Sequence, residues 1–166
     1  MSETPVTATQ EDYLEAILFL AEEEGGQAAV RSRDLAKRLN THKSTVSNTL
    51  RVLVDKELID FEPYGGIRLT EKGRSIAERV AHNHRLIMAF LQNTLLMDPQ
   101  KAEENACRIE HVVDAEVVER LALFSRHIGN CPDSAGHCFS RYSSHINGLV
   151  SEDLSFPDLE PSSEKE

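Results

Sequence analysis

Residues 30–70 carry the pattern that most constrains the fold, because two short amphipathic helices are followed at once by a glycine-centred hairpin. After a short strand, the first helix is expected to be capped by Ser32 and to end at a turn over residues 40–41. The second helix is expected to span about 43–56. Two short runs of β-type residues then flank the Gly-Gly pair at 65–66. A hairpin directly after a helix-turn-helix is typical of the winged variant.

The second predicted helix has one apolar face, formed by Val46, Leu50 and Leu53 at helical spacing. The opposite face carries small polar side chains and one arginine, namely Ser44, Ser47, Asn48 and Arg51. Such a face can enter the major groove and contact base edges. Taken alone, it is more typical of an ordinary solvated helix. The hairpin that follows favours DNA binding.

The charge distribution supports this interpretation. The whole chain has a net charge of −10, yet residues 31–79 hold eleven Lys and Arg against seven Asp and Glu, a net of +4. In this segment Lys43 and Arg68 are expected to contact phosphates. An acidic chain excludes a uniformly basic nucleic-acid coat, but it allows DNA binding by one local surface.

A further helix is expected before this segment, capped by Thr9, starting near Gln10 and ended by the glycines at 25–26. Its core-facing side is apolar and consists of Tyr13, Leu14, Ile17, Leu18 and Ala21. On the side away from this stripe, a phenylalanine lies between the carboxylates of Asp12 and Glu15. This mixture indicates that a second element covers the side.

Three more helices are expected after the hairpin. A long helix opened by a threonine spans 70–96, and Asp98 with the following proline starts another over 99–113. Asp114 can cap a third helix over about 115–127. Three helices after a winged head are typical of a helical dimerisation domain.

We therefore predict a mainly α chain in which an N-terminal winged helix-turn-helix with a small β-hairpin wing precedes an all-helical dimerisation and metal-binding domain. The DNA-binding domain is expected over 8–75 and the helical domain over 76–145. An acidic tail over 146–166 is expected to be disordered, because it ends in a stretch with six acids, two prolines and little to bury.

A thiol, a carboxylate and an imidazole share one face of the predicted 99–113 helix, at Cys107, Glu110 and His111. Their i, i+3, i+4 spacing lets the three side chains reach a common ion. An exposed polar face with one incidental cysteine explains the pattern equally well.

His84 falls among apolar residues of the preceding helix, where an imidazole needs a polar partner. A lone histidine there is more often a satisfied core residue. Yet Asp12 and Glu15 also occupy a covered face, so three separate helices present ligand-type groups toward partly buried ground. Buried carboxylates repel each other unless a cation joins them.

Four motifs give the chain a resemblance to a known family: Asp12-Tyr13-Leu14-Glu15, the winged helix-turn-helix, His84-Arg85-Leu86 and Cys107-Arg108-Ile109-Glu110-His111. Over about 8–140 the chain resembles the diphtheria-toxin-repressor and manganese-transport-regulator family of metal-dependent repressors. The resemblance implies a homodimer that binds palindromic operators in double-stranded DNA when it is loaded with Mn²⁺ or Fe²⁺, and that represses metal-uptake genes. It also implies six metal ligands, which are Asp12, Glu15, His84, Cys107, Glu110 and His111.

The implied ligand set is a hybrid of the two branches of that family. Asp12 matches the manganese type, whereas iron-type members usually have Met there. Cys107 matches the iron type, whereas the manganese type has Glu. Around His84, the iron type's ancillary site would have Glu in place of Met88 and His in place of Glu103. The thiolate shifts the metal preference toward iron, zinc and cobalt, so the sequence assigns no single metal.

Two other functions are weighed against the repressor. One is a winged-helix regulator that senses thiol oxidation through Cys131 and Cys138. The other is an enzyme using the Cys/His/Glu set, which is the weakest because no oxyanion loop or glycine-rich phosphate motif is present. We expect a non-enzymatic cytoplasmic protein without membrane association, since the sequence has no signal-like segment and no long apolar run.

Overall fold

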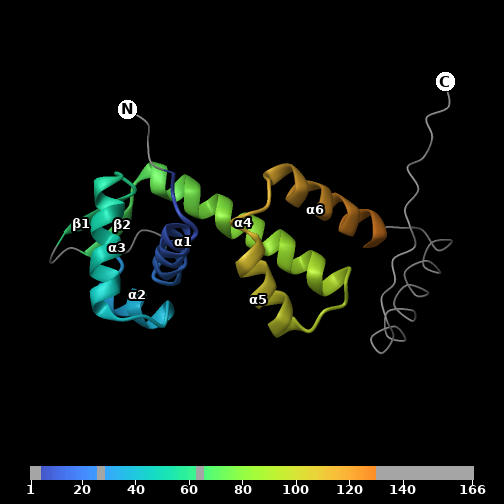
Figure 1. The fold of residues 1–166 in the computed structure, drawn as a ribbon, viewed down its shortest axis with the longest axis horizontal. Coiled ribbons are helices and arrows are strands. Elements are labelled where there is room, and N and C mark those ends of the chain that lie inside the picture. The colour runs from blue at the N-terminus through green and yellow to red at the C-terminus, as the bar shows by residue number, and fades with distance from the viewer. Residues whose placement is uncertain (1–4, 26–28, 63–65, 130–166) are drawn as a thin grey trace, which may run out of the picture. The chain divides into compact units, whose positions relative to one another are not determined.

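The computed structural model describes residues 5–25, 29–62 and 66–129. Its elements in chain order are α1 (Ala8–Glu23), α2 (Ser32–Arg38), α3 (Lys43–Asp55), β1 (Ile59–Glu62), β2 (Gly66–Leu69), α4 (Glu71–Asn93), α5 (Pro99–Ile109) and α6 (Ala115–Gly129) (Figure 1). The predicted mainly α fold with a winged helix-turn-helix is confirmed. Residues 1–122 form one compact unit and residues 123–166 another, of which the structure describes only the end of α6.

The winged head is built from α1, α2, α3 and the two strands. β1 and β2 pair antiparallel with Ile59 opposite Leu69, and each strand places one residue in the core, Ile59 from β1 and Ile67 from β2. The short strand predicted before α2 is reduced to a single bridge, in which Val30 and Ile67 exchange two backbone hydrogen bonds of 2.8 Å. Leu14, packed with these residues, is fully buried.

Two predicted helix caps are wrong. Helix α1 is capped by Thr7 instead of Thr9, and Thr7 forms a reciprocal capping box with Gln10. Ser32 is the first residue of α2 instead of its cap, because Arg31 holds the extended cap position and makes no side-chain cap bond. The predicted apolar face of α1 is nevertheless buried as expected.

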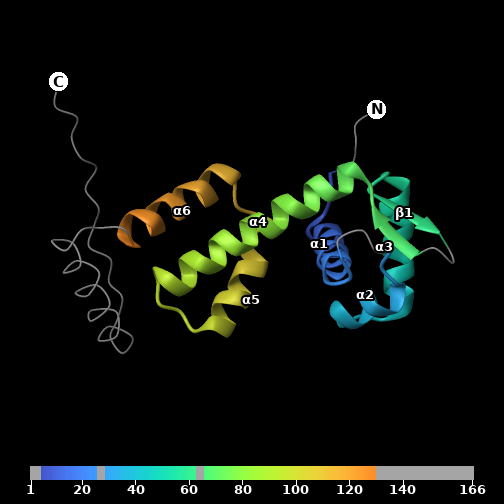
Figure 2. The same cartoon turned by 180° about the vertical axis from the view of Figure 1, so that it is seen from behind.

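Helix α4 connects the head to the helices that follow it (Figures 1 and 2). As predicted, Thr70 caps it by accepting a hydrogen bond from the Gly73 amide at 3.1 Å. A side chain at Gly73 would collide with the Leu58 carbonyl, so only glycine lets α4 approach the end of the head so closely. The N-terminal half of α4 packs into the head core, and Ile87 and Leu91 belong to a second core with α5.

Two helix ends come earlier than predicted. Helix α4 ends at Asn93, and Leu96 adopts a positive φ of 56° in the connection that follows. Helix α5 ends at Ile109, and the backbone amides of Val112 and Val113 both donate to the Ile109 carbonyl, which turns the chain toward α6. His111 therefore lies in a turn instead of on the helix.

The remaining predictions on the fold concern residues or divisions that the structure leaves untested. Cys131, Cys138 and the proposed acidic tail lie outside the described residues. The domain divisions after residues 75 and 145 stay predictions. In the described part of the chain, no helix has the length and apolar character needed to cross a membrane.

Candidate metal centre

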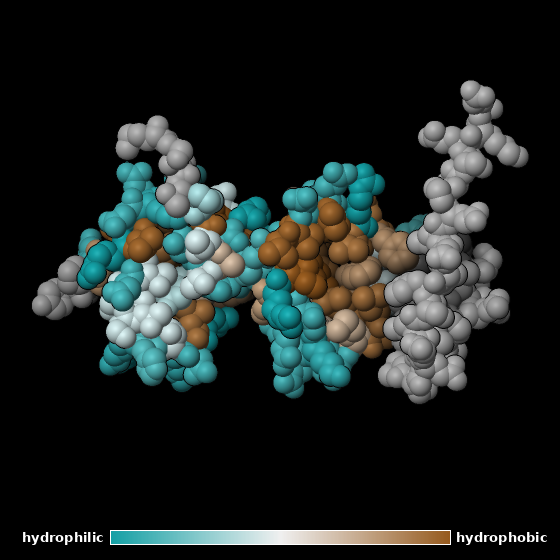
Figure 3. All heavy atoms as spheres, in the orientation of Figure 1, coloured by the Kyte–Doolittle hydropathy of each residue, from teal (hydrophilic) through white to brown (hydrophobic). Residues whose placement is uncertain are grey.

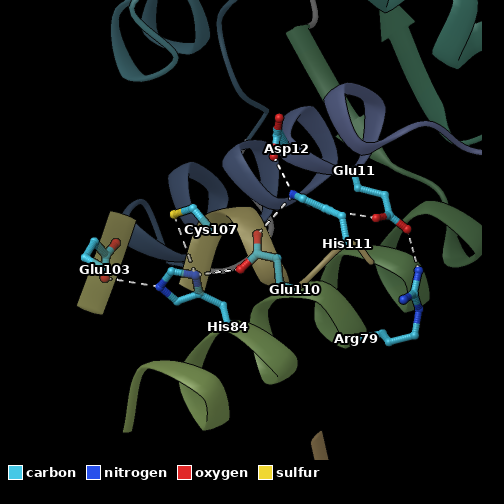
Figure 4. Close-up of polar contacts among 8 residues, drawn as sticks. All are labelled: Glu11, Asp12, Arg79, His84, Glu103, Cys107, Glu110 and His111. Carbon is cyan, nitrogen blue, oxygen red and sulfur yellow. Dashed lines mark hydrogen bonds and ion pairs between the residues drawn. The ribbon is translucent and has the colours of Figure 1, made fainter. Parts of the chain in front are cut away.

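A cluster of polar side chains lies where α4 passes from the head core to the second core. His84 occupies this position on α4, between Ala81 of the first core and Ile87 of the second. Helix α1 packs on α4 from the head, and α5 packs on it from the other core. Figure 4 shows side chains of α5 and the segment after it around His84, and acidic side chains of α1 at His111, on the other side of Glu110.

His84 uses both edges of its ring. Its Nδ1 atom lies 2.6 Å from Glu110 Oε2, and its Nε2 atom lies 3.2 Å from Glu103 Oε2. Cys107 Sγ lies 3.8 Å from Nδ1. One imidazole of α4 thus contacts three different ligand-type groups from α5 and the residue that follows it.

His111 is held in the same manner on the other side of Glu110. Its Nε2 atom lies 2.8 Å from Asp12 Oδ1 and 3.3 Å from Glu110 Oε1, so the two oxygens of Glu110 face different histidines. Its Nδ1 atom lies 2.8 Å from Glu11 Oε2, and the other oxygen of Glu11 accepts a 2.6 Å bond from Arg79. Because α1 supplies Glu11 and Asp12, His111 connects the head to the end of α5.

Carboxylates of this cluster are shielded from water, so their negative charges are energetically unfavourable without a compensating partner. Glu110 is only 2% exposed. Glu15 Oε1 is buried without a hydrogen-bond partner. Burial, followed by the charge of Glu110, raises the pKa of Glu15 to about 7. A cation beside these groups would offset the cost of a buried carboxylate oxygen that has no hydrogen-bond donor.

The negative charge of the carboxylates also shifts the pKa values of the two histidines and of the Cys107 thiol. The hydrogen bond to Glu110 raises the pKa of His84 to about 9, against the opposing effect of burial. Burial lowers the pKa of His111, but the Glu11 hydrogen bond and the neighbouring carboxylates raise it overall. Burial and the charge of Glu110 raise the pKa of the Cys107 thiol to about 11. A bound cation would lower the pKa of each of these groups.

The ligand atoms form three overlapping groups, each compact enough to hold one metal ion. The first group is Asp12, Glu110 and His111, the second is Glu15, His84 and Glu110, and the third is His84, Glu103 and Cys107. In each group the atoms lie within 4.8 Å of one another. All six predicted ligand residues are thus brought together. Their role as ligands stays a prediction.

Sequence reasoning did not select two residues of the cluster. Glu103 falls on the same predicted helix face as Cys107, Glu110 and His111 but is not among the predicted ligands, yet its carboxylate contacts His84. Glu11 was not considered at all, although it is 8% exposed. The signal for Glu103 was its helical spacing, one turn before Cys107 on α5. Glu11 gave no signal, because its partners are about 70 and 100 residues away.

The predicted DNA-contacting residues lie in the head and are all solvent-exposed: Lys43, Ser44, Ser47, Asn48, Arg51 and Arg68. All but the last belong to α3, whose opposite face is buried through Val46, Leu50 and Leu53. The Ser47 hydroxyl donates a 3.0 Å bond to the Lys43 carbonyl. Arg68 lies on β2, directly opposite Asp60 of β1. Their contacts with DNA stay a prediction.

Comparison with known proteins decides the family. Residues 5–67 match the iron dependent repressor N-terminal DNA binding domain, and residues 70–137 match the iron dependent repressor metal binding and dimerisation domain. A helix-turn-helix transcriptional regulator of Methanocaldococcus jannaschii is 39% identical over 114 residues, which are 69% of this chain and 90% of that protein. The chain belongs to the iron-dependent repressor family.

Solved structures agree with this family. The manganese regulator SloR superposes with a TM-score of 0.63 at 30% identity, and the match covers 75% of this chain and 55% of SloR. A manganese-dependent transcriptional repressor in complex with manganese superposes with a TM-score of 0.61, also at 30% identity, over 70% of this chain and 52% of that one. The chain thus spans about half the length of these two structural relatives.

Family membership confirms the predicted resemblance and the fold. It also confirms the prediction that the chain is a DNA-binding transcriptional regulator with a metal-binding domain, and not an enzyme. Neither matching domain points to thiol sensing. The two cysteines of that alternative lie outside the described residues.

Proposed function

We propose that this chain is a repressor whose binding to operator DNA depends on a divalent metal ion held by the predicted ligands. The observation that carries the proposal is the buried Glu110, whose two oxygens face His84 and His111 while Glu15 beside them lacks a partner. A cation at this place would compensate the buried carboxylates and supply Glu15 with its missing interaction.

The proposed metal is Mn²⁺ or Fe²⁺. Carboxylate oxygens and imidazole nitrogens dominate the set, and such donors suit these ions. The proposed ligands are Asp12, Glu15, His84, Cys107, Glu110 and His111. When bound, the ion supplies positive charge and fixed coordination. The protein's own contribution is to bring donors of three chain segments to one place, in the cytoplasm where such ions are sensed.

The ligands explain how metal would control DNA binding. Asp12 and Glu15 belong to α1 of the DNA-binding head, whereas His84 belongs to α4 and the others to α5 or the turn after it. Without a cation, mutual repulsion of the carboxylates favours separation of α1 from the end of α5. With the charge compensated, the head is fixed against the helices of the second core.

A homodimer would convert this fixed head into operator recognition. Two copies related by a two-fold axis would present two α3 helices to major grooves about 34–36 Å apart, which requires a palindromic operator. The turn after α5 and the start of α6 offer apolar surface for a second copy, since Val112 is 79% and Val117 46% exposed. Figure 3 shows apolar side chains gathered over the C-terminal half of α4 and the start of α6.

The test is operator binding with and without metal. Fluorescence anisotropy with an operator fragment would be measured with Mn²⁺, with Fe²⁺ under anaerobic conditions, and with excess chelator. We expect metal to raise the operator affinity by about 5–150-fold, the usual range of allosteric coupling. Equal affinity in saturating metal and in chelator would overturn the proposed control by metal.

A further inference from the structure

Arg79 of α4 begins a row of polar contacts that ends in the candidate metal centre. Its Nη2 atom donates a 2.6 Å hydrogen bond to Glu11 Oε1. The second oxygen of Glu11 lies 2.8 Å from His111 Nδ1, and His111 Nε2 lies 2.8 Å from Asp12 Oδ1. Figure 4 shows these contacts as one row from Arg79 to Asp12. The row takes its members from α4, α1 and the turn after α5.

The contact between Arg79 and Glu11 differs from an ordinary surface ion pair. The Glu11 side chain is only 10% exposed, and both of its oxygens have a partner. On the same helix, Arg74 and Glu78 lie 3.8 Å apart and are both accessible to solvent. Exposed pairs of that kind contribute little to stability, whereas a buried carboxylate depends on its cationic partner. Loss of Arg79 would therefore act first on Glu11.

The packing of α1 on α4 does not depend on this ion pair. Leu14 of α1 is buried in the same apolar core as Ala77 and Ala81 of α4. Burial of apolar surface holds the two helices together, but it is non-directional and does not fix how a polar side chain is oriented. The hydrogen bond from Arg79 is directional, so its specific effect is on the orientation of the Glu11 carboxylate.

The orientation of Glu11 decides what it can do for the metal centre. Glu11 precedes Asp12 in the chain, yet within the described residues it belongs to none of the three compact donor groups. Because Arg79 holds one of its oxygens, the other is directed to His111 Nδ1, across the ring from Nε2. A carboxylate at the far nitrogen of a metal-binding imidazole fixes the tautomer and the orientation of the ring. Glu11 is thus placed to support His111 and not to bind the ion.

We propose that Arg79 is a positioning residue of the metal centre, which acts through Glu11 to fix the ring of His111 in the orientation that metal binding requires. The inference rests on the proposed function, because it concerns the ion that the predicted ligands would hold. It assigns a role to a residue that is not itself a predicted ligand. The ring of His111 is then oriented before an ion arrives, so less of the binding free energy is lost in ordering it.

The test is a double-mutant cycle on Mn²⁺ affinity, measured by competition with a fluorescent chelator. Arg79→Ala is expected to weaken Mn²⁺ binding by about tenfold, at the lower end of the range for residues that orient a metal ligand. In a Glu11→Ala background the same change is expected to have no further effect, because its route to His111 is already removed. Arg79→Lys keeps a positively charged donor and should lose less. Arg74→Ala, on a partly exposed arginine of the same helix, is the matched control and should bind Mn²⁺ as the parent does.

The cycle separates a positioning role from a general structural one. If Arg79→Ala weakens Mn²⁺ binding equally with and without Glu11, or leaves it unchanged in the parent, the inference is overturned. An equal loss in Arg79→Lys and Arg79→Ala would overturn it as well. A parent that binds Mn²⁺ without a change in operator affinity would overturn the proposed function instead, while the cycle still decides the role of Arg79. A parent that binds no Mn²⁺ would overturn both.

Discussion

The predicted DNA surface and the candidate metal centre are built in opposite ways. The predicted DNA surface is nearly all on α3, its side chains are exposed, and the Ser47 hydroxyl bonds to its own helix. The metal centre takes side chains from α1, α4 and the end of α5, and Glu110 at its middle is buried. The predicted DNA surface comes mainly from one helix and is accessible to a partner, whereas the candidate metal centre forms only where three segments of the chain meet.

This difference separates two kinds of failure. A change on α3 should alter what the protein recognises without altering its response to metal. A change in the metal centre should alter the response to metal while the intrinsic preference for a base sequence stays the same. A variant on α3 that changed the metal response, or a variant in the metal centre that changed the preferred base sequence, would contradict this separation.

The largest effect is expected for Glu110→Ala. It removes the carboxylate that faces both His84 and His111, so metal should no longer raise operator affinity, a loss of about 5–150-fold. Anisotropy titrations with Mn²⁺ and with chelator measure this gain directly. The exposed Glu104→Ala serves as the matched control, and a thermal melt checks folding. A full metal response in Glu110→Ala would contradict the proposed centre.

The next effect is expected for Glu11→Ala, which leaves the proposed ligands in place. Glu11 accepts from Nδ1 of His111 and so directs Nε2 toward Asp12 and Glu110. Removing such an orienting partner usually costs about 10–100-fold in metal affinity. Glu11→Gln keeps an acceptor oxygen and should lose less. Competition with a fluorescent chelator measures Mn²⁺ affinity, and equal values for the three proteins would contradict the role of Glu11.

A smaller effect, confined to DNA binding, is expected for variants of the predicted DNA surface. Arg51→Ala should relax the choice of base sequence by about 1–3 kcal/mol at one position. Arg68→Ala on β2 should weaken binding to all sequences and reduce the salt slope by about one unit. Competition assays with operator variants at several salt concentrations measure both. An unchanged operator preference in Arg51→Ala would mean that α3 is docked differently.

The smallest effect is a pH dependence of the metal-free protein. The folded-state pKa of His84 is about 9 against an ordinary value of 6.5, so its stabilising contribution is complete below pH 6.5 and is lost as the pH rises through 9. Denaturant melts in chelator should therefore show a falling free energy of unfolding over this window, by less than about 1.4 kcal/mol per pH unit. His84→Gln should flatten the curve, and an unchanged slope would contradict this origin.

The sequence by itself determined the features that depend on local periodicity. The exposed face of α3, the hairpin after it and the Thr70 cap follow from backbone hydrogen bonds within a few residues, and each is where the pattern predicts it. The choice of the capping residue of α1 depends on side-chain hydrogen bonds, because the capping box with Gln10 favours Thr7 over the predicted Thr9.

Tertiary structure alone decided how the polar residues meet. Sequence spacing grouped Cys107, Glu110 and His111 on one helix face, but α5 ends before Glu110 and turns His111 toward α1. The contacts of Glu11 and the two-sided environment of His84 arise from the packing of α1 and α5 on α4. A helical repeat fixes which residues share a face, whereas only packing between distant segments fixes which faces meet.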